Sequence, residues 1–260
     1  MINFAAEELK TTITPEKLFD IGGLSVTNSM LYGWIVAALL IVVLTLGVRK
    51  LKIGGTKGLS ELLEVGVQFM VGLGKSTLGS DKLALKYTPL FATLFFFIVI
   101  NNWMGLLPGI GHSVIYSEHA LLRPFTADIN GTLAMALFGM VTVQAISIRE
   151  GGLKSHLKHY FPGKMYNPAT YFIGAFEIFT ELTRLLSLGL RLFLNIAIGE
   201  ILILVATFLG GPGGAISAVP FTMLEIFVGA LQAFIFVVLC MAYLSATISH
   251  SDHTGGEEHA

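Results

Sequence analysis

Of the 260 residues in the chain, 54% are hydrophobic and only 13% are charged, whereas an ordinary soluble domain has about 25% charged residues. The 16 basic and 17 acidic side chains nearly cancel to a net charge of -1, so there is no basic surface to hold nucleic acid. The single cysteine, Cys240, excludes an intramolecular disulfide and a cysteine-based metal cluster. This composition argues against a soluble enzyme and favours a membrane protein.

Residues 1–29 are interpreted as the N-terminal segment of the mature protein, on the outer side of the membrane. This segment begins MINFAAEELK, with acids where a secretory signal has a basic region, and the first apolar run starts only near Met30.

Five runs are long enough to cross a bilayer, which takes about 20 mostly apolar residues. They are residues 30–48, which carry no charge, then 88–107, 128–149, 169–208 and 215–249. A helix of about 40 residues is about 60 Å long, twice the hydrocarbon thickness, so the last two runs predict a long tilted hairpin. The glycine-rich segment Gly210 to Gly214 is its turn, Pro168 and Pro220 suit first-turn positions, and residues 250–260 form a polar cytoplasmic tail.

A further helix is predicted for residues 58–79. Its apolar positions recur at helical spacing (Leu59, Leu62, Leu63, Gly66, Phe69, Met70 and Leu73), with Glu61, Glu64, Gln68 and Lys75 on the other side. This pattern indicates a helix on the membrane surface, and an amphipathic helix against a soluble core is the alternative. The predicted fold is a single all-α polytopic membrane domain, residues 1–260.

The orientation follows from the basic residues of the loops. Eleven lie after the first and third crossings: Arg49, Lys50, Lys52, Lys57, Lys75, Lys82, Lys86, Arg149, Lys154, Lys158 and Lys164. Three lie on the opposite side: Lys10, Lys17 and Arg123. The excess predicts an N-terminus outside and a C-terminus in the cytoplasm, with a bacterial inner (plasma) membrane as the best fit.

Residues 169–208 contain five charged side chains: Glu177, Glu181, Arg184, Arg191 and Glu200. Each charge costs roughly 2.5 to 3.5 kcal/mol at mid-membrane, and each large apolar side chain returns only about 0.3 to 0.6 kcal/mol. The charges must therefore be paired, lie near an interface, or face protein or water.

The polar residues of the last two crossings form stripes, because they follow steps of three and four residues. One stripe is Glu177, Glu181, Arg184, Leu188, Arg191, Asn195 and Gly199, and the other is Glu225, Gly229, Gln232, Phe236 and Tyr243. Facing stripes indicate an ion path or a polar contact surface. A structural ion-pair cluster of Glu177, Glu181 and Arg184 is the alternative for the first part. Arg191 has no acid within one helical turn, which points to a carboxylate on a partner chain.

Several motifs together resemble subunit a of rotary F-type ATP synthases. They are Ser187-Leu-Gly-Leu-Arg191-Leu-Phe-Leu-Asn195 with Gly199-Glu200, Asn101-Asn-Trp-Met-Gly-Leu-Leu-Pro108, Ala127-Asp-Ile-Asn130, and Leu231-Gln-Ala-Phe-Ile-Phe-Val-Val-Leu239 with Tyr243. The likeness covers about residues 88 to 249, in the right order, whereas residues 1–87 match only in topology.

The resemblance implies a non-catalytic stator subunit, without cofactor, that gives protons two offset half-channels to a ring of c subunits. Arg191 would face the ring carboxylate, with Asn195 orienting it. Five residues would line the outer half-channel: Glu200, Glu225, Gln232, Asp128 and Asn130. Three would line the cytoplasmic exit: Glu177, Arg184 and Ser187. The b subunits of the peripheral stalk, the rest of the ATP synthase complex and the lipid bilayer are the other implied partners.

The sequence departs from the family pattern at two positions. Leu194 stands where the family usually has Gly, which predicts altered packing beside Arg191. Glu225 stands where some members have His. If Glu225 and Glu200 lie close together, one of the two carboxylates would hold a proton near neutral pH.

The histidines indicate no metal site. His156 and His159 are spaced like a ligand pair but lie in a Lys-rich loop, His112 and His119 lie in an outer loop, and His250, His253 and His259 lie in the polar tail.

Two other classes of protein compete with this interpretation. A self-contained secondary cation transporter would also need intramembrane carboxylates and an arginine, but the two halves show no matched pair of Gly/Pro-interrupted segments. An intramembrane enzyme would need a nucleophile with a base, and Ser187 has no histidine near it in sequence.

Overall fold

The computed structural model describes residues 15–49, 58–107, 115–116, 119–120, 122–153 and 168–255. Its α-helices are α2 Asn28–Arg49, α3 Leu59–Leu78, α4 Asp81–Gly105, α5 Ile129–Gly151, α7 Pro168–Leu209 and α8 Gly214–Gly255. Two short pairs of antiparallel strands are also present. The strands β1 Lys17–Ile21 and β2 Leu24–Thr27 precede α2, and β3 Ile115–Tyr116 and β4 His119–Ala120 lie between α4 and α5 in the chain. The 3-10 helices are η2 Phe125–Ala127 and η3 Gly211–Gly213.

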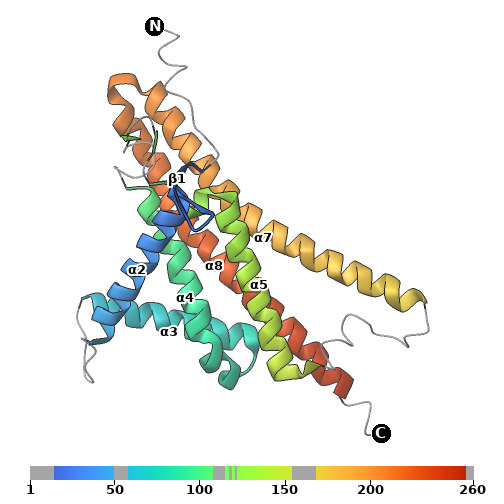
Figure 1. Ribbon diagram of the computed structural model, residues 1–260. Helices are drawn as coiled ribbons and strands as arrows, with labels where there is room; N and C mark the ends of the chain where they lie inside the picture. The colour runs from blue at the N-terminus through green and yellow to red at the C-terminus, as the bar shows by residue number, and fades with distance from the viewer. Residues whose placement is uncertain are drawn as a thin grey trace.

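Five of the helices are long and apolar enough to cross a membrane: α2, α4, α5, α7 and α8. The sixth, α3, lies across the others (Figure 1) and packs against α4 and α8. Its Phe69 ring lies 6.4 Å from that of Phe95 and 6.0 Å from that of Phe234. The all-α polytopic membrane fold is therefore confirmed.

The longest pair of helices, α7 and α8, runs side by side from the turn at η3, and the first part of α7 diverges from α8 toward the other end (Figure 1). Helix α5 packs against both. Small residues allow this close approach: a side chain at Gly189 would press on Leu133 and Ala136, and one at Gly139 would touch Phe236 and Cys240. The polar stripes predicted for the last two crossings lie on α7 and α8 of this three-helix group.

The core of the described chain lies among α3, α4, α5, α7 and α8, with Ile98, Val143, Leu192 and Leu244 as examples of fully enclosed side chains. By contrast, α2 and α7 carry many exposed apolar residues, including Trp34, Phe172, Phe176 and Leu194. Such faces are stable in lipid or against a partner subunit, as expected for helices that cross a bilayer.

Two prolines lie inside helices rather than at their starts. Pro220, predicted for a first turn, is the seventh residue of α8, because the helix begins directly after η3 at Gly214. Helix α4 begins at Asp81, well before the predicted start at residue 88, so that Pro89 is internal. A proline removes one helical hydrogen bond, which bends or weakens a helix without having to end it. Pro168 does begin α7, as expected.

The β1–β2 hairpin was missed by the sequence analysis, although Gly22-Gly23 with positive φ angles of 59° and 91° is the two-residue turn such hairpins prefer. Helix α8 also continues to Gly255, into the segment expected to be a polar tail.

Several of the residues on which expectations rest lie outside the described residues. They are Lys10, Lys50, Lys52, Lys57, Pro108, His112, Lys154, His156, Lys158, His159, Lys164 and His259. Of the other histidines, His119 is in β4, and His250 and His253 are in the last turns of α8.

Candidate functional site

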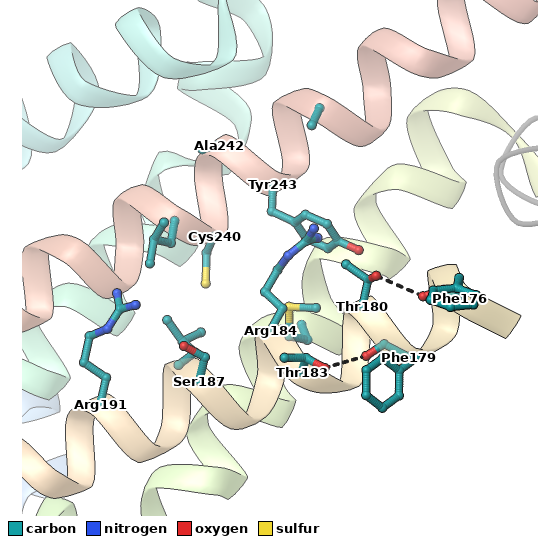
Figure 2. Close-up of a pocket in the computed structure, with 14 residues that line it drawn as sticks. Phe176, Phe179, Thr180, Thr183, Arg184, Ser187, Arg191, Cys240, Ala242 and Tyr243 are labelled. Carbon is teal, nitrogen blue, oxygen red and sulfur yellow. Dashed lines mark hydrogen bonds between the residues drawn. The ribbon is translucent and has the colours of Figure 1, made fainter. Parts of the chain in front are cut away.

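The site is centred on Arg191, near the middle of α7. Its side chain is exposed and lines two pockets, which we name after residues of α8 (Figure 2 shows the first). The tyrosine pocket, of about 760 Å³, lies between α7 and α8 and contains Arg184, Ser187, Arg191, Cys240 and Tyr243. The glutamine pocket, of about 520 Å³, contains Ser187, Arg191, Asn195 and Gln232. Arg191 and Ser187 therefore stand where the two pockets adjoin.

The tyrosine pocket has a fixed network of polar side chains in its wall. The Arg184 guanidinium carbon lies 3.8 Å from the centre of the Tyr243 ring, and Figure 2 shows the two side chains facing each other. The Tyr243 hydroxyl donates to Glu181 Oε1 at 2.5 Å. The Gln144 amide of α5 donates to Glu181 Oε1 and to the Tyr243 hydroxyl. The network thus joins α5, α7 and α8.

The contacts in this network differ from those of the ion-pair cluster that was the alternative for Glu177, Glu181 and Arg184. Arg184 stacks on an aromatic ring, and Glu181 accepts hydrogen bonds from two other helices. Glu177 is half-buried one turn before Glu181. The partners Gln144 and Tyr243 were not expected for Glu181, because they are 37 and 62 residues away along the chain.

On the other side of Arg191, Glu225 of α8 is only 4% exposed. Its carboxyl group fills the space in which Gly199 of α7 would otherwise carry a side chain. Glu200, the next residue, interacts electrostatically with Glu225 and also with Arg123 and Tyr32. The Glu225 carboxyl group thus lies against the residue that precedes Glu200, near enough for the charges of the two carboxylates to interact.

Several polar side chains of α4, α7 and α8 have buried atoms that lack a hydrogen-bond partner among the described residues. They are Glu225 Oε1, Gln232 Nε2, Asn195 Nδ2, Asn101 Oδ1 and Asn102 Oδ1. Asn102 Nδ2 donates to the Gly229 carbonyl at 3.0 Å, and Trp103 Nε1 donates to the Ile226 carbonyl at 2.9 Å. These bonds attach the end of α4 to α8 within a turn of Glu225. The paired amides Asn101 and Asn102 inside an apolar helix are the signal that could have placed Asn102 at the site.

Asp128 and Asn130 lie elsewhere. Asp128 precedes α5 and accepts a hydrogen bond from the backbone N–H of Asn130 at 3.0 Å, as an N-cap does. It also accepts from the Ser29 hydroxyl of α2 at 2.6 Å. Both residues line a separate pocket of about 470 Å³ between α2 and α5. The structure therefore does not bring them into the two pockets that Arg191 lines.

The fold and the site define a polytopic membrane protein whose last two long helices enclose ionisable groups on both sides of an exposed arginine. The family model "ATP synthase A chain" matches residues 30–245. The chain belongs to the ATP synthase subunit a family. It is therefore a multi-pass membrane subunit of an F-type ATP synthase, with a part in the proton transport that accompanies ATP synthesis.

The relatives match along most of the chain. ATP synthase subunit a of Moorella thermoacetica is 30% identical over 235 residues, which are 90% of this chain and 97% of the relative. That of Gloeobacter violaceus is 31% identical over 237 residues, 90% of each chain. That of Campylobacter concisus is 32% identical over 198 residues, 76% of this chain and 79% of the relative.

Proposed function

We propose that the chain is the non-catalytic stator subunit that conducts protons to and from a rotating ring of c subunits through two offset half-channels. The observation that carries the proposal is the position of Arg191 at the junction of the tyrosine pocket and the glutamine pocket. A proton path interrupted by a permanent positive charge cannot conduct straight through. Protons must therefore travel on a carrier that passes the arginine.

Arg191 suits this task for two reasons. Its guanidinium cannot lose a proton in a protein, so it cannot relay one between the two pockets. Its charge also favours the ionised form of a nearby carboxyl group. A ring carboxylate that reaches the exposed Arg191 side chain would release its proton there and stay ionised until it has passed.

The outer half-channel would consist of Glu200, Glu225, Gln232 and Asn195. Support comes from buried atoms of Glu225, Gln232 and Asn195 that lack a hydrogen-bond partner among the described residues, and from the electrostatic interaction of Glu225 with Glu200. Two interacting carboxylates bind and release a first proton more readily than a second one. Asp128 and Asn130 would lie toward the outer mouth of this path, in their separate pocket between α2 and α5.

The exit would be the tyrosine pocket, with Arg184, Ser187 and Glu177 near its cytoplasmic end. The excess of basic loop residues after α2 and α5 supports this orientation, with the N-terminus outside and the C-terminus in the cytoplasm. The exposed apolar face of α7 would lie against the ring, and the peripheral-stalk b subunits would hold the chain still in a bacterial inner membrane.

The test is the Arg191→Ala variant of the complete ATP synthase in inverted membrane vesicles. We expect ATP-driven acidification to fall to background, while ATP hydrolysis by the peripheral head persists. Arg191→Lys should also pump poorly, because a compact ammonium lacks the spread charge and the several donors of a guanidinium. Undiminished pumping by Arg191→Ala would overturn the proposal. Purification of the chain as an active unit without a ring of small subunits would instead support a self-contained transporter.

A further inference from the structure

The tyrosine pocket contains two arginines, and they are held in different ways. Arg191 has no acid within one helical turn, whereas Arg184 is three residues from Glu181, a spacing at which opposite charges on a helix can pair. Yet the Arg184 guanidinium lies on the Tyr243 ring, and its Nη1 is buried without a hydrogen-bond partner among the described residues. The contact that the structure shows for the Arg184 guanidinium is therefore with an aromatic ring of α8.

The position of the Tyr243 ring is fixed at its far end. Its hydroxyl donates to Glu181 Oε1 at 2.5 Å and lies 3.3 Å from Gln144 Nε2. Gln144 also donates to Glu181. Tyr243 is 8% exposed, so the ring has little freedom to turn. One carboxylate and one amide, from α7 and α5, thus hold a ring of α8 in a single orientation.

This arrangement has two consequences for Arg184. A guanidinium stacked on a fixed aromatic face gains attraction from the ring and loses less freedom than one that must choose among rotamers. At the same time, Glu181 already accepts the bonds of Tyr243 and Gln144, so its carboxylate is turned toward them. The positive charge of Arg184 is left in the wall of the tyrosine pocket (Figure 2), about two helical turns, or roughly 10 Å, from Arg191.

We infer that Tyr243, held by Glu181 and Gln144, is a positioning residue that keeps the Arg184 guanidinium in the wall of the tyrosine pocket, where its charge assists proton release. This inference rests on the proposed function, in which that pocket is the proton exit. A second fixed positive charge in the pocket favours the ionised form of a carboxyl group that has reached it and repels protons that would return.

The test is a double-mutant cycle on the complete ATP synthase, read as ATP-driven acidification per assembled complex. A cation–π contact changes the ratio of the conformation in which the arginine lies on the ring to its other conformations by about two- to thirtyfold. We expect Tyr243→Leu and Arg184→Ala each to lower the pumping rate by a factor in that range. The double variant should be no slower than Arg184→Ala alone, because Tyr243 acts through Arg184.

Two further variants separate positioning from simple packing. Tyr243→Phe keeps the aromatic face and should retain most of the pumping that Tyr243→Leu loses. Phe236→Leu, which changes another enclosed ring of α8 at the Gly139 contact, should give the same fractional loss with and without Arg184. If Tyr243→Leu does not assemble, Tyr243→Met replaces it in the cycle, because methionine also lacks the aromatic face and its flexible side chain fills irregular spaces in a core.

Three results would overturn the inference. One is an equal loss from Tyr243→Leu in the presence and absence of Arg184, and another is a Tyr243→Phe variant as slow as Tyr243→Leu. The third is an Arg184→Ala variant that pumps at the original rate. Each of these can occur while Arg191→Ala still abolishes pumping, so that the proposed function would stand. Pumping that survives Arg191→Ala would instead remove the proposed function itself.

Discussion

The polar groups on the two sides of Arg191 are held differently. In the tyrosine pocket, Glu181, Tyr243 and Gln144 bond to one another, and Arg184 stacks on the ring. In the glutamine pocket and beside it, the buried carboxylate and amide groups have atoms without a hydrogen-bond partner in the described part of the chain. The first side is a connected network in which Arg184 Nη1 is also left without a partner among the described residues, whereas no hydrogen bond between side chains links Glu225, Gln232 and Asn195 in the described part of the second.

The difference fits two tasks along the proposed proton path. Mutually bonded groups hold a charge at a fixed place, because each partner restricts the others. Buried polar groups without protein partners are costly unless water or a transferred proton satisfies them. The side with Glu225, Gln232 and Asn195 is therefore suited to pass protons along, whereas the side with Tyr243 is suited to keep a positive charge still.

The largest effect that tests this comparison is expected for Glu225→Gln. The amide has nearly the shape of the carboxylate but cannot bind and release a proton, so pumping should fall by about 10²-fold or more if Glu225 transfers protons. The measurement is ATP-driven acidification per assembled complex. Tyr243→Phe, which removes one hydroxyl from the opposite side, is the matched comparison. Pumping by Glu225→Gln that matches that of the unmodified enzyme would show that Glu225 is only part of the packing.

A smaller effect is expected for Gly199→Ala. The added methyl group would overlap the carboxyl group of Glu225, which must then move, and overpacking of this kind costs about 1 to 3 kcal/mol. We expect a severalfold loss of pumping with a lower thermal stability of the complex. Gly72→Ala in α3 is the control, because a methyl group there would meet open space within the described chain. Equal behaviour of the two variants would contradict the close packing of Glu225 on α7.

The smallest effect is expected for Asp128→Asn. Asparagine can also cap a helix, so α5 should keep its N-terminal bond and pumping should stay within about twofold of the original rate. Asp128→Ala, which removes the cap, should destabilise the protein by about 1 kcal/mol. Thermal denaturation and vesicle acidification measure the two quantities. If Asp128→Asn is stable and yet does not pump, the carboxylate itself takes part in proton transfer.

The stripes of the last two helices could be predicted from sequence because they depend only on helical spacing. Steps of three and four residues placed Arg184, Arg191 and Asn195 on one face, and the structure has them along the two adjoining pockets. The contacts of Glu181 could not be predicted in this way. Its partners Gln144 and Tyr243 belong to other helices, and spacing within one helix carries no information on which helices meet.

Some of the helix limits could be predicted from sequence, and others could not. The first crossing, predicted for residues 30–48, is α2 Asn28–Arg49, because the helix begins and ends close to the limits of the uninterrupted apolar run. The prediction for Pro220 was wrong because a proline is compatible with a first turn and also with an irregularity inside a helix. The β1–β2 hairpin has a local signal in its Gly22-Gly23 turn, but apolar runs carry no information about it.

If Arg191 separates two paths that open to opposite sides of the membrane, cysteines introduced into the two pockets should be accessible from opposite faces. The native thiol of Cys240 lines the tyrosine pocket, so Cys240→Ser is the background. Thr183→Cys would report on the tyrosine pocket and Ile198→Cys on the glutamine pocket, since both side chains are exposed lining residues. In membranes that contain the complete ATP synthase, a charged, membrane-impermeant thiol reagent should modify the cysteine at 183 only from the cytoplasmic face and the cysteine at 198 only from the opposite face. Modification of both cysteines from the same face would contradict the account.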